Sequence, residues 1–118
     1  MNFTILITAP VFDSQGAYSA YQFAKNVFAK SHSIEQIFFY NAGVYNANRF
    51  IAPPSDELNL VQLWQMLAKQ YSIKLHLCVA AAQRRGVIEK NLADGFSITG
   101  LGQLIEAINA SDRFIVFN

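Results

Sequence analysis

The only cysteine of the chain, Cys78, lies where a predicted strand passes into a predicted helix. The apolar run at 73–77 is typical of a buried strand in a parallel sheet, and the three alanines at 80–82 favour a helix. A thiol at this junction would lie at the carboxyl edge of the sheet, where open α/β sheets bind ligands. It would also lie at the positive end of a helix dipole, which favours the thiolate. The alternative is that Cys78 is a buried small hydrophobic residue, the more frequent role of a lone cysteine.

Three neighbours could stabilise a thiolate or contact a partner. Arg85 follows Cys78 by seven positions and so shares its helical face, about 10 Å further along the axis. His76 shares its strand face at roughly 6 to 7 Å, which is too far for a direct hydrogen bond and makes a Cys–His protease pair unattractive. Packing in the strand is the plainer interpretation of His76. Arg84 and Arg85 are either a solvated helix end or a basic patch for an acidic partner or a phosphate backbone.

Composition limits the function classes. The 118 residues make one domain, residues 1–118. A net charge of +1 argues against a general nucleic-acid surface. Cys78, His32 and His76 are a poor supply of zinc ligands, and a free thiol suits a reducing cytoplasm. No apolar stretch approaches the roughly 18 to 20 residues that span a bilayer, so we expect no membrane contact.

The charged fraction, 14%, is low against about 25% in ordinary globular domains. A small domain has too much surface to bury so much apolar area alone. Subunit interfaces bury such area, because they resemble a core cut in two. The composition therefore predicts an obligate oligomer.

The periodicity predicts alternating strands and helices, with strands at 2–8, 34–40, 73–78 and 114–117 and helices at 17–30, 60–71 and 100–110. Asp13 or Ser14, Asn59 and Thr99 are the predicted N-caps. The last helix carries a regular apolar stripe of Leu101, Leu104, Ile105 and Ile108. This order predicts a single-domain α/β three-layer sandwich, a mostly parallel sheet with helices on both faces. A nucleotide- or flavin-binding domain is a third hypothesis, although the loop at 13–16 lacks a glycine fingerprint.

Several segments together carry a more specific pattern than any single motif. They are Phe38-Phe39-Tyr40, the runs 43–48 (GVYNAN), 54–57 (PSDE) and 78–87 (CVAAAQRRGV), then Gly95-Phe96 and Gly100-Leu101-Gly102. In these segments, over nearly its whole length, the sequence resembles the DsrE family of small sulfur-relay proteins.

The resemblance implies a DsrE-like fold and a sulfurtransferase that needs no cofactor and no metal. By position, Cys78 matches the cysteine that carries a persulfide. The implied partners are TusB-like and TusC-like subunits in a heterohexamer, a TusA-like sulfur donor and a TusE-like acceptor, with the sulfur ending in the 2-thiouridine of the tRNA wobble position. Direct tRNA binding is not expected. The alternatives are a DsrE-type subunit of a sulfur-oxidation relay and a non-catalytic assembly subunit.

One segment departs from the family pattern. Between Arg85 and Asn91 the family usually carries a longer segment than the five residues present here. Either the chain has a natural deletion, or a mobile loop is missing between Val87 and Asn91. We expect the missing loop, because a mobile segment beside the thiol would allow two partner proteins to reach it in turn.

Overall fold

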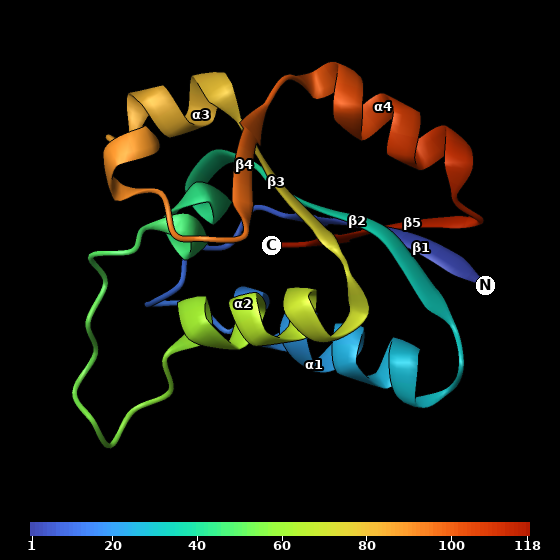
Figure 1. Cartoon of the computed structure of the whole chain (residues 1–118), viewed down its shortest axis with the longest axis horizontal. Coiled ribbons are helices and arrows are strands. Elements are labelled where there is room, and N and C mark those ends of the chain that lie inside the picture. Colours follow the sequence, from blue (N-terminus) through green and yellow to red (C-terminus); the bar gives the residue numbers. More distant parts are fainter.

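The structure of the protein is a computed structural model that describes all residues 1–118. Its backbone forms one five-stranded sheet in which every pair of neighbouring strands is parallel (Figure 1). The spatial order is β4-β3-β2-β1-β5. All five strands therefore point their carboxyl ends toward the same edge. The strands are β1 (Asn2–Ile7), β2 (Ser33–Phe39), β3 (Lys74–Cys78), β4 (Phe96–Thr99) and β5 (Arg113–Phe117).

Helices cover both faces of the sheet, as predicted. Figure 1 shows α1 (Gly16–Ala29) and α2 (Leu60–Tyr71) together on one face, with α3 (Val79–Arg84) and α4 (Leu101–Ala110) on the other. Two short 3₁₀ helices, η1 (Asn41–Ala47) and η2 (Glu89–Asn91), follow β2 and α3. The three-layer α/β prediction is confirmed, and no helix combines the length and apolar character that crossing a membrane requires.

The core lies mainly between the sheet and the α1/α2 layer. Trp64 of α2 is fully buried, and its ring makes edge contacts with Tyr21 of α1 and Phe39 of β2. Ile5 and Ile37, side by side in β1 and β2, are also fully buried. This packing explains the apolar stripes of α1 and α2, because both stripes pack against the same face of the sheet.

The opposite face is covered less completely. Thr4 of β1 donates its hydroxyl to the Ala107 carbonyl of α4 at 3.0 Å, which fixes the helix over the sheet. Leu104 is buried there, but Leu101 is 48% and Ile105 56% exposed. The predicted stripe of α4 therefore does not lie wholly in the core of a single chain. The expectation of an oligomer stays a prediction, and this exposed apolar surface is where we expect a subunit to pack.

The predicted boundaries differ from the structure in three places. Strand β4 was not predicted, because it has four residues and follows a positive-φ glycine, Gly95. Gln15 rather than Asp13 or Ser14 is the N-cap of α1, although Ser14 Oγ accepts a hydrogen bond from the Gly16 amide at 3.1 Å. Gly100 rather than Thr99 caps α4. The Asn59 cap of α2 is confirmed by a 3.2 Å bond from the Gln62 amide.

The expectation that a loop is missing between Val87 and Asn91 is also wrong. The backbone runs without a break through Val87 to Asn91 and forms η2 on the way. The Val87 amide donates to the Ala82 carbonyl at 2.9 Å, and Asn91 Oδ1 accepts from the Ile88 amide at 2.8 Å. The segment is therefore a short hydrogen-bonded connection. Of the two alternatives, a natural deletion relative to the family is the one that remains.

Candidate functional site

Cys78 is the last residue of β3 and the N-cap residue of α3, as its sequence context predicts. It pairs with Thr99 of β4 and lies one strand in from the sheet edge. In the isolated chain it is only 4% exposed. The next residue, Val79, is 41% exposed. The thiol thus lies directly beneath the surface, at the boundary between core and solvent.

Small residues let α3 pack closely behind the thiol. Ala81 and Ala82 are fully buried, and α3 contacts both β3 and η1. Gly43 of η1 approaches β1 so closely that a Cβ built on it would lie 2.0 Å from the Ile7 carbonyl oxygen. The alanine run and this glycine are therefore what a tight stack of β1, η1 and α3 requires.

Asn46 fastens η1 to the rest of the sheet edge. Its side chain is fully buried and donates to the carbonyls of Ala9 at 3.1 Å and Gly43 at 2.9 Å. Its Oδ1 accepts from Trp64 Nε1 at 3.2 Å. One amide thus joins the β1 loop, η1 and α2, and it satisfies polar groups that burial would otherwise leave unpaired. Sequence reasoning missed this residue, since an asparagine in a turn-rich segment gives no sign of burial.

Arg85 caps the C-terminal end of α3, the helix that starts after the cysteine. Its Nη1 donates to the Ala81 carbonyl at 3.2 Å, one of the carbonyls that face the end of the helix. The side chain is half-buried, whereas that of Arg84 is exposed. Of the two adjacent arginines, only Arg85 therefore has a guanidinium fixed on the helix, at its C-terminal end.

His76 is half-buried on the same sheet face as Cys78, two residues earlier in β3. Burial, with a smaller contribution from the charge of Lys74, lowers the pKa of His76 below its ordinary value of 6.5. Its Nδ1 is buried without a hydrogen-bond partner. The imidazole is therefore neutral at pH 7 and supplies no positive charge to a thiolate.

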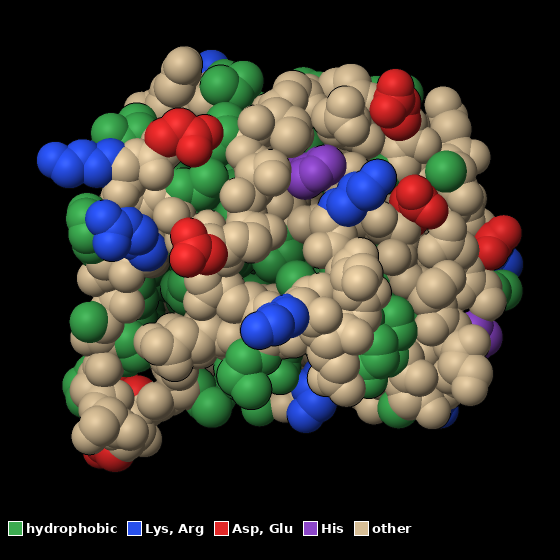
Figure 2. Space-filling view, in the orientation of Figure 1, with side chains coloured by type: hydrophobic (Ala, Val, Ile, Leu, Met, Phe, Trp, Pro, Cys, Tyr) green, Lys and Arg blue, Asp and Glu red, His purple; other side chains and the backbone are tan.

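A second feature of the site, which we call the basic shelf, continues from the end of α3. Asn48 and Leu92 form an antiparallel bridge, and the Arg49 amide donates to the Asn91 carbonyl at 2.8 Å. Arg49 Nε also donates to the Lys90 carbonyl at 2.9 Å. The shelf consists of Arg49, Phe50, Arg84, Ile88 and Lys90, all exposed. Figure 2 shows Lys and Arg side chains with hydrophobic ones between them on this side of the molecule, at the left of the view, together with acidic groups.

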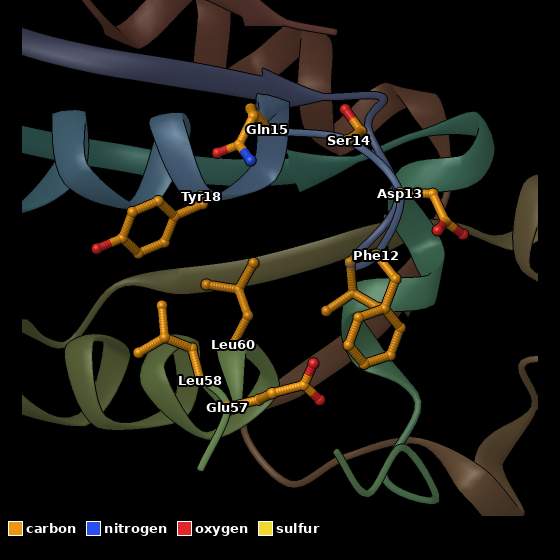
Figure 3. A pocket seen from close by; sticks show the side chains of 9 residues that line it. Phe12, Asp13, Ser14, Gln15, Tyr18, Glu57, Leu58 and Leu60 are labelled. Carbon is orange, nitrogen blue, oxygen red and sulfur yellow. The ribbon is translucent and has the colours of Figure 1, made fainter. Parts of the chain in front are cut away.

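A cavity of about 630 Å³ opens elsewhere along the carboxyl edge, between the loop after β1 and the segment before α2. Figure 3 shows Tyr18, Leu58 and Leu60 facing it, with the Glu57 carboxylate beside the Phe12 ring. None of Cys78, His76, Arg84 or Arg85 lines this cavity. Its charged lining residues are Asp13 and Glu57, and no Lys, Arg or His lines it, so the cavity suits phosphate groups poorly. This counts against the nucleotide-binding hypothesis.

The fold and the site define an α/β protein with a thiol at the carboxyl end of an inner parallel strand. The family model of the DsrE/DsrF-like family matches residues 1–117. The chain belongs to this family.

Curated relatives give the activity class. The chain is 47% identical to "Sulfurtransferase TusD" of Cronobacter sakazakii, over 99% of this chain and all of that protein. It is 46% identical to "Sulfurtransferase TusD homolog" of Haemophilus influenzae, over 98% of each. This close, full-length similarity places the chain among the sulfurtransferases. The first alignment spans 128 positions, more than the chain's 118 residues, so this chain is shorter than that relative, which fits a deletion.

Solved structures show the same fold at low sequence identity. The ychN protein of E. coli superposes with a TM-score of 0.85 at 18% identity, over 99% of this chain and 100% of that one. A Methanobacterium thermoautotrophicum protein, MTH1491, gives 0.71 at 16% identity over 97% of each chain. These two similarities concern the fold alone, and they confirm the DsrE-like architecture.

Proposed function

We propose that Cys78 carries sulfane sulfur as a persulfide between two protein thiols. The observation that supports this most is the position of Cys78: the only thiol of a sulfurtransferase-family chain lies at the carboxyl edge, next to exposed Val79 and at the start of α3. The amides at the start of this helix and the guanidinium of Arg85 are the groups that would stabilise the thiolate.

The chemistry balances without a cofactor. The Cys78 thiolate attacks the outer sulfur of a donor persulfide, R–S–SH. A bond forms between Cys78 Sγ and that sulfur, the donor S–S bond breaks, and the donor leaves as its thiolate R–S⁻. Cys78 then holds –S–SH, and an acceptor thiolate repeats the attack on the outer sulfur. No net oxidation or reduction occurs in either step.

The burial of Cys78 makes the first step the demanding one. Attack by Sγ requires the donor sulfur to reach an atom that is nearly covered in the isolated chain. After loading, the outer sulfur lies about 2 Å further out, because this is the length of an S–S bond. We therefore propose that Val79 and the start of α3 shift when a donor docks, and that the second step needs a smaller movement.

The pathway proposal follows the family resemblance. The chain works with TusB-like and TusC-like subunits, receives sulfur from a TusA-like donor and passes it to a TusE-like acceptor for tRNA 2-thiouridine synthesis. The free thiol suits a cytoplasmic setting. A sulfur-oxidation relay would use the same thiol, and identification of the proteins that co-purify with the chain from its native cell separates the two pathways.

The test is intact-mass spectrometry after incubation with cysteine persulfide, a small sulfane-sulfur donor. Wild type gains one sulfur atom, and that atom is removed by dithiothreitol. Cys78→Ser, which keeps the size of the side chain, folds and gains none. A wild type that takes up no sulfur, or a serine variant that takes it up equally, rejects the assignment.

The 4% exposure of Cys78 favours one alternative, a non-catalytic subunit in which the thiol only packs. In that case Cys78 resists a small alkylating reagent at all concentrations of donor protein, and Cys78→Ser affects only stability. Under the sulfur-carrier proposal, alkylation of the native protein proceeds slowly. After loading with sulfur, the reagent reacts with the outer sulfur instead, so its adduct becomes a disulfide that dithiothreitol removes.

A further inference from the structure

We infer that the basic shelf is the docking surface for an acidic face of the sulfur-carrying partner protein. The inference rests on the proposed role of Cys78, because a persulfide relay needs a partner that brings its own thiol to this edge. It adds where that partner sits and which charge it carries.

The position of the shelf is the first argument. Arg84 ends the six-residue helix that Cys78 caps, so its Cα lies about 9 Å from that of the cysteine along the axis. The main-chain bonds between Arg49 and Asn91 and between Ala93 and Ala47 join the rest of the shelf to the same edge. A protein bound across the shelf would therefore cover Val79 and the thiol beneath it.

The charge distribution is the second argument. Arg49, Arg84 and Lys90 of the shelf, with adjacent Arg85, hold four of the nine Lys and Arg residues of the chain, against one exposed carboxylate in the same segment, Glu89. The hydrogen bonds that Arg49 and Arg85 donate go to backbone carbonyls. Cations whose donors are not occupied by carboxylates of their own chain remain available to carboxylates of a partner.

The apolar groups are the third argument, and they favour a protein over a nucleic acid. Phe50 is 58% and Ile88 50% exposed between the cations. The Arg49 guanidinium lies 4.5 Å from the centre of the Phe50 ring, so cation and ring present one combined surface. Exposed apolar groups within a charged rim are typical of protein interfaces.

The shelf is rigid, and this rigidity supports its role as a surface that binds a partner protein. Asn91 Nδ2 donates to the Gly86 carbonyl at 3.0 Å, and its Oδ1 accepts from the Ile88 amide. With the Asn48–Leu92 bridge, these bonds hold the short connection after α3 in one conformation. A preorganised surface loses little entropy when a partner binds.

The experiment compares two persulfidated peptides of equal length, Glu-Asp-Gly-Cys-Gly-Asp-Glu and Gln-Asn-Gly-Cys-Gly-Asn-Gln, as sulfur donors to the full chain. The shelf predicts that the acidic peptide loads Cys78 about tenfold faster at low salt, and that the ratio falls toward one in 0.5 M salt, where the Debye length is about 4 Å. Neutralising the shelf with Arg84→Gln and Lys90→Gln together lowers the ratio to about two. The matched control, Lys25→Gln with Lys69→Gln on α1 and α2, makes the same change of charge and keeps the tenfold ratio.

The outcomes separate this inference from the proposed function. A ratio near one at low salt, with loading from cysteine persulfide intact, overturns the shelf and leaves the sulfur carrier standing. No loading from any donor overturns the proposed function. A labelled 20-nucleotide single-stranded RNA measured by anisotropy tests the phosphate alternative: tight binding that the shelf variants abolish, without an acidic-peptide advantage, also overturns the inference.

Discussion

Replacement of Asn46 by alanine should destabilise the whole carboxyl edge. The substitution removes three buried hydrogen bonds and leaves two carbonyls and the Trp64 indole N–H without their partner. At about 1 kcal/mol net for each bond, with a further penalty for unpaired buried groups, the free energy of unfolding should fall by about 3 to 5 kcal/mol. That is a large part of the roughly 5 to 15 kcal/mol that holds a domain together.

Urea unfolding followed by tryptophan fluorescence measures this loss, and the thermal midpoint should fall by about 10 to 15 °C. Asn46→Asp separates hydrogen bonding from volume, because it keeps the size and the acceptor for Trp64 but loses both donors. We expect it to be destabilising to a similar degree near pH 7. Asn109→Ala, at an exposed position of α4, is the control and should change stability by less than about 0.5 kcal/mol.

The same variant links packing to the site. Since η1 packs against α3, loosening η1 should also speed alkylation of Cys78. A loss below about 1 kcal/mol for Asn46→Ala, or a near-neutral Asn46→Asp, would refute the view that this amide organises the edge.

Three further predictions concern neighbouring residues. His76→Asn should flatten the pH dependence of stability below pH 6.5. The pKa of His76 is lowered in the folded chain, so its contribution to stability is full above pH 6.5 and is lost as the pH falls, because the unfolded chain binds the proton first. Equal slopes of unfolding free energy against pH, from urea titrations of both proteins, would contradict this. Gly43→Ala should lower the free energy of unfolding by about 3 kcal/mol, since the new Cβ meets a β1 carbonyl at 2.0 Å. Gly102→Ala, whose new Cβ meets open space, should leave stability unchanged or raise it, and thermal melting measures both variants. Arg85→Gln should slow loading from cysteine persulfide several-fold, and Arg113→Gln on the far strand β5 should not; equal rates would remove Arg85 from the thiolate environment.

Much of the fold could be predicted because its signals are local. The apolar runs of β1, β2 and β3 and the periodic faces of α1 and α2 follow from the spacing of side chains in strands and helices. The Asn59 cap follows from the chemistry of one side chain. Strand β4 could not be predicted in this way, because its four residues form a strand only through pairing with β3.

The site was predictable in position but not in surroundings. The strand-to-helix junction at Cys78 is visible in the sequence, whereas the packing of η1 against β3 and α3 around it consists of long-range contacts. The same holds for Asn46 and Arg49, whose partners lie far along the chain. Arg85 lies between these cases: its spacing of seven residues from Cys78 predicts the helical face, but only the structure shows that its guanidinium caps the Ala81 carbonyl.

The exposed stripe of α4 has a different cause. Leu101 and Ile105 follow the period of a buried helix face, but only Leu104 and Ala107 of α4 are buried in the chain. The pattern is local and correct, whereas the surface that would cover it belongs to another subunit in our proposal. Periodicity therefore predicts which residues avoid water, not which molecule covers them.

In the proposed mechanism, one sulfur atom resides on Cys78 and leaves to another protein thiol. Peptide-level mass spectrometry tests it most directly: the chain is loaded with ³⁴S-labelled persulfide, mixed with a co-purified acceptor protein, trapped with iodoacetamide and digested. We predict that the label starts on the peptide containing Cys78 and appears on an acceptor cysteine in equal amount as it disappears from Cys78. Label that never resides on Cys78, or that reaches the acceptor equally well from Cys78→Ser, would rule out Cys78 as the sulfur carrier.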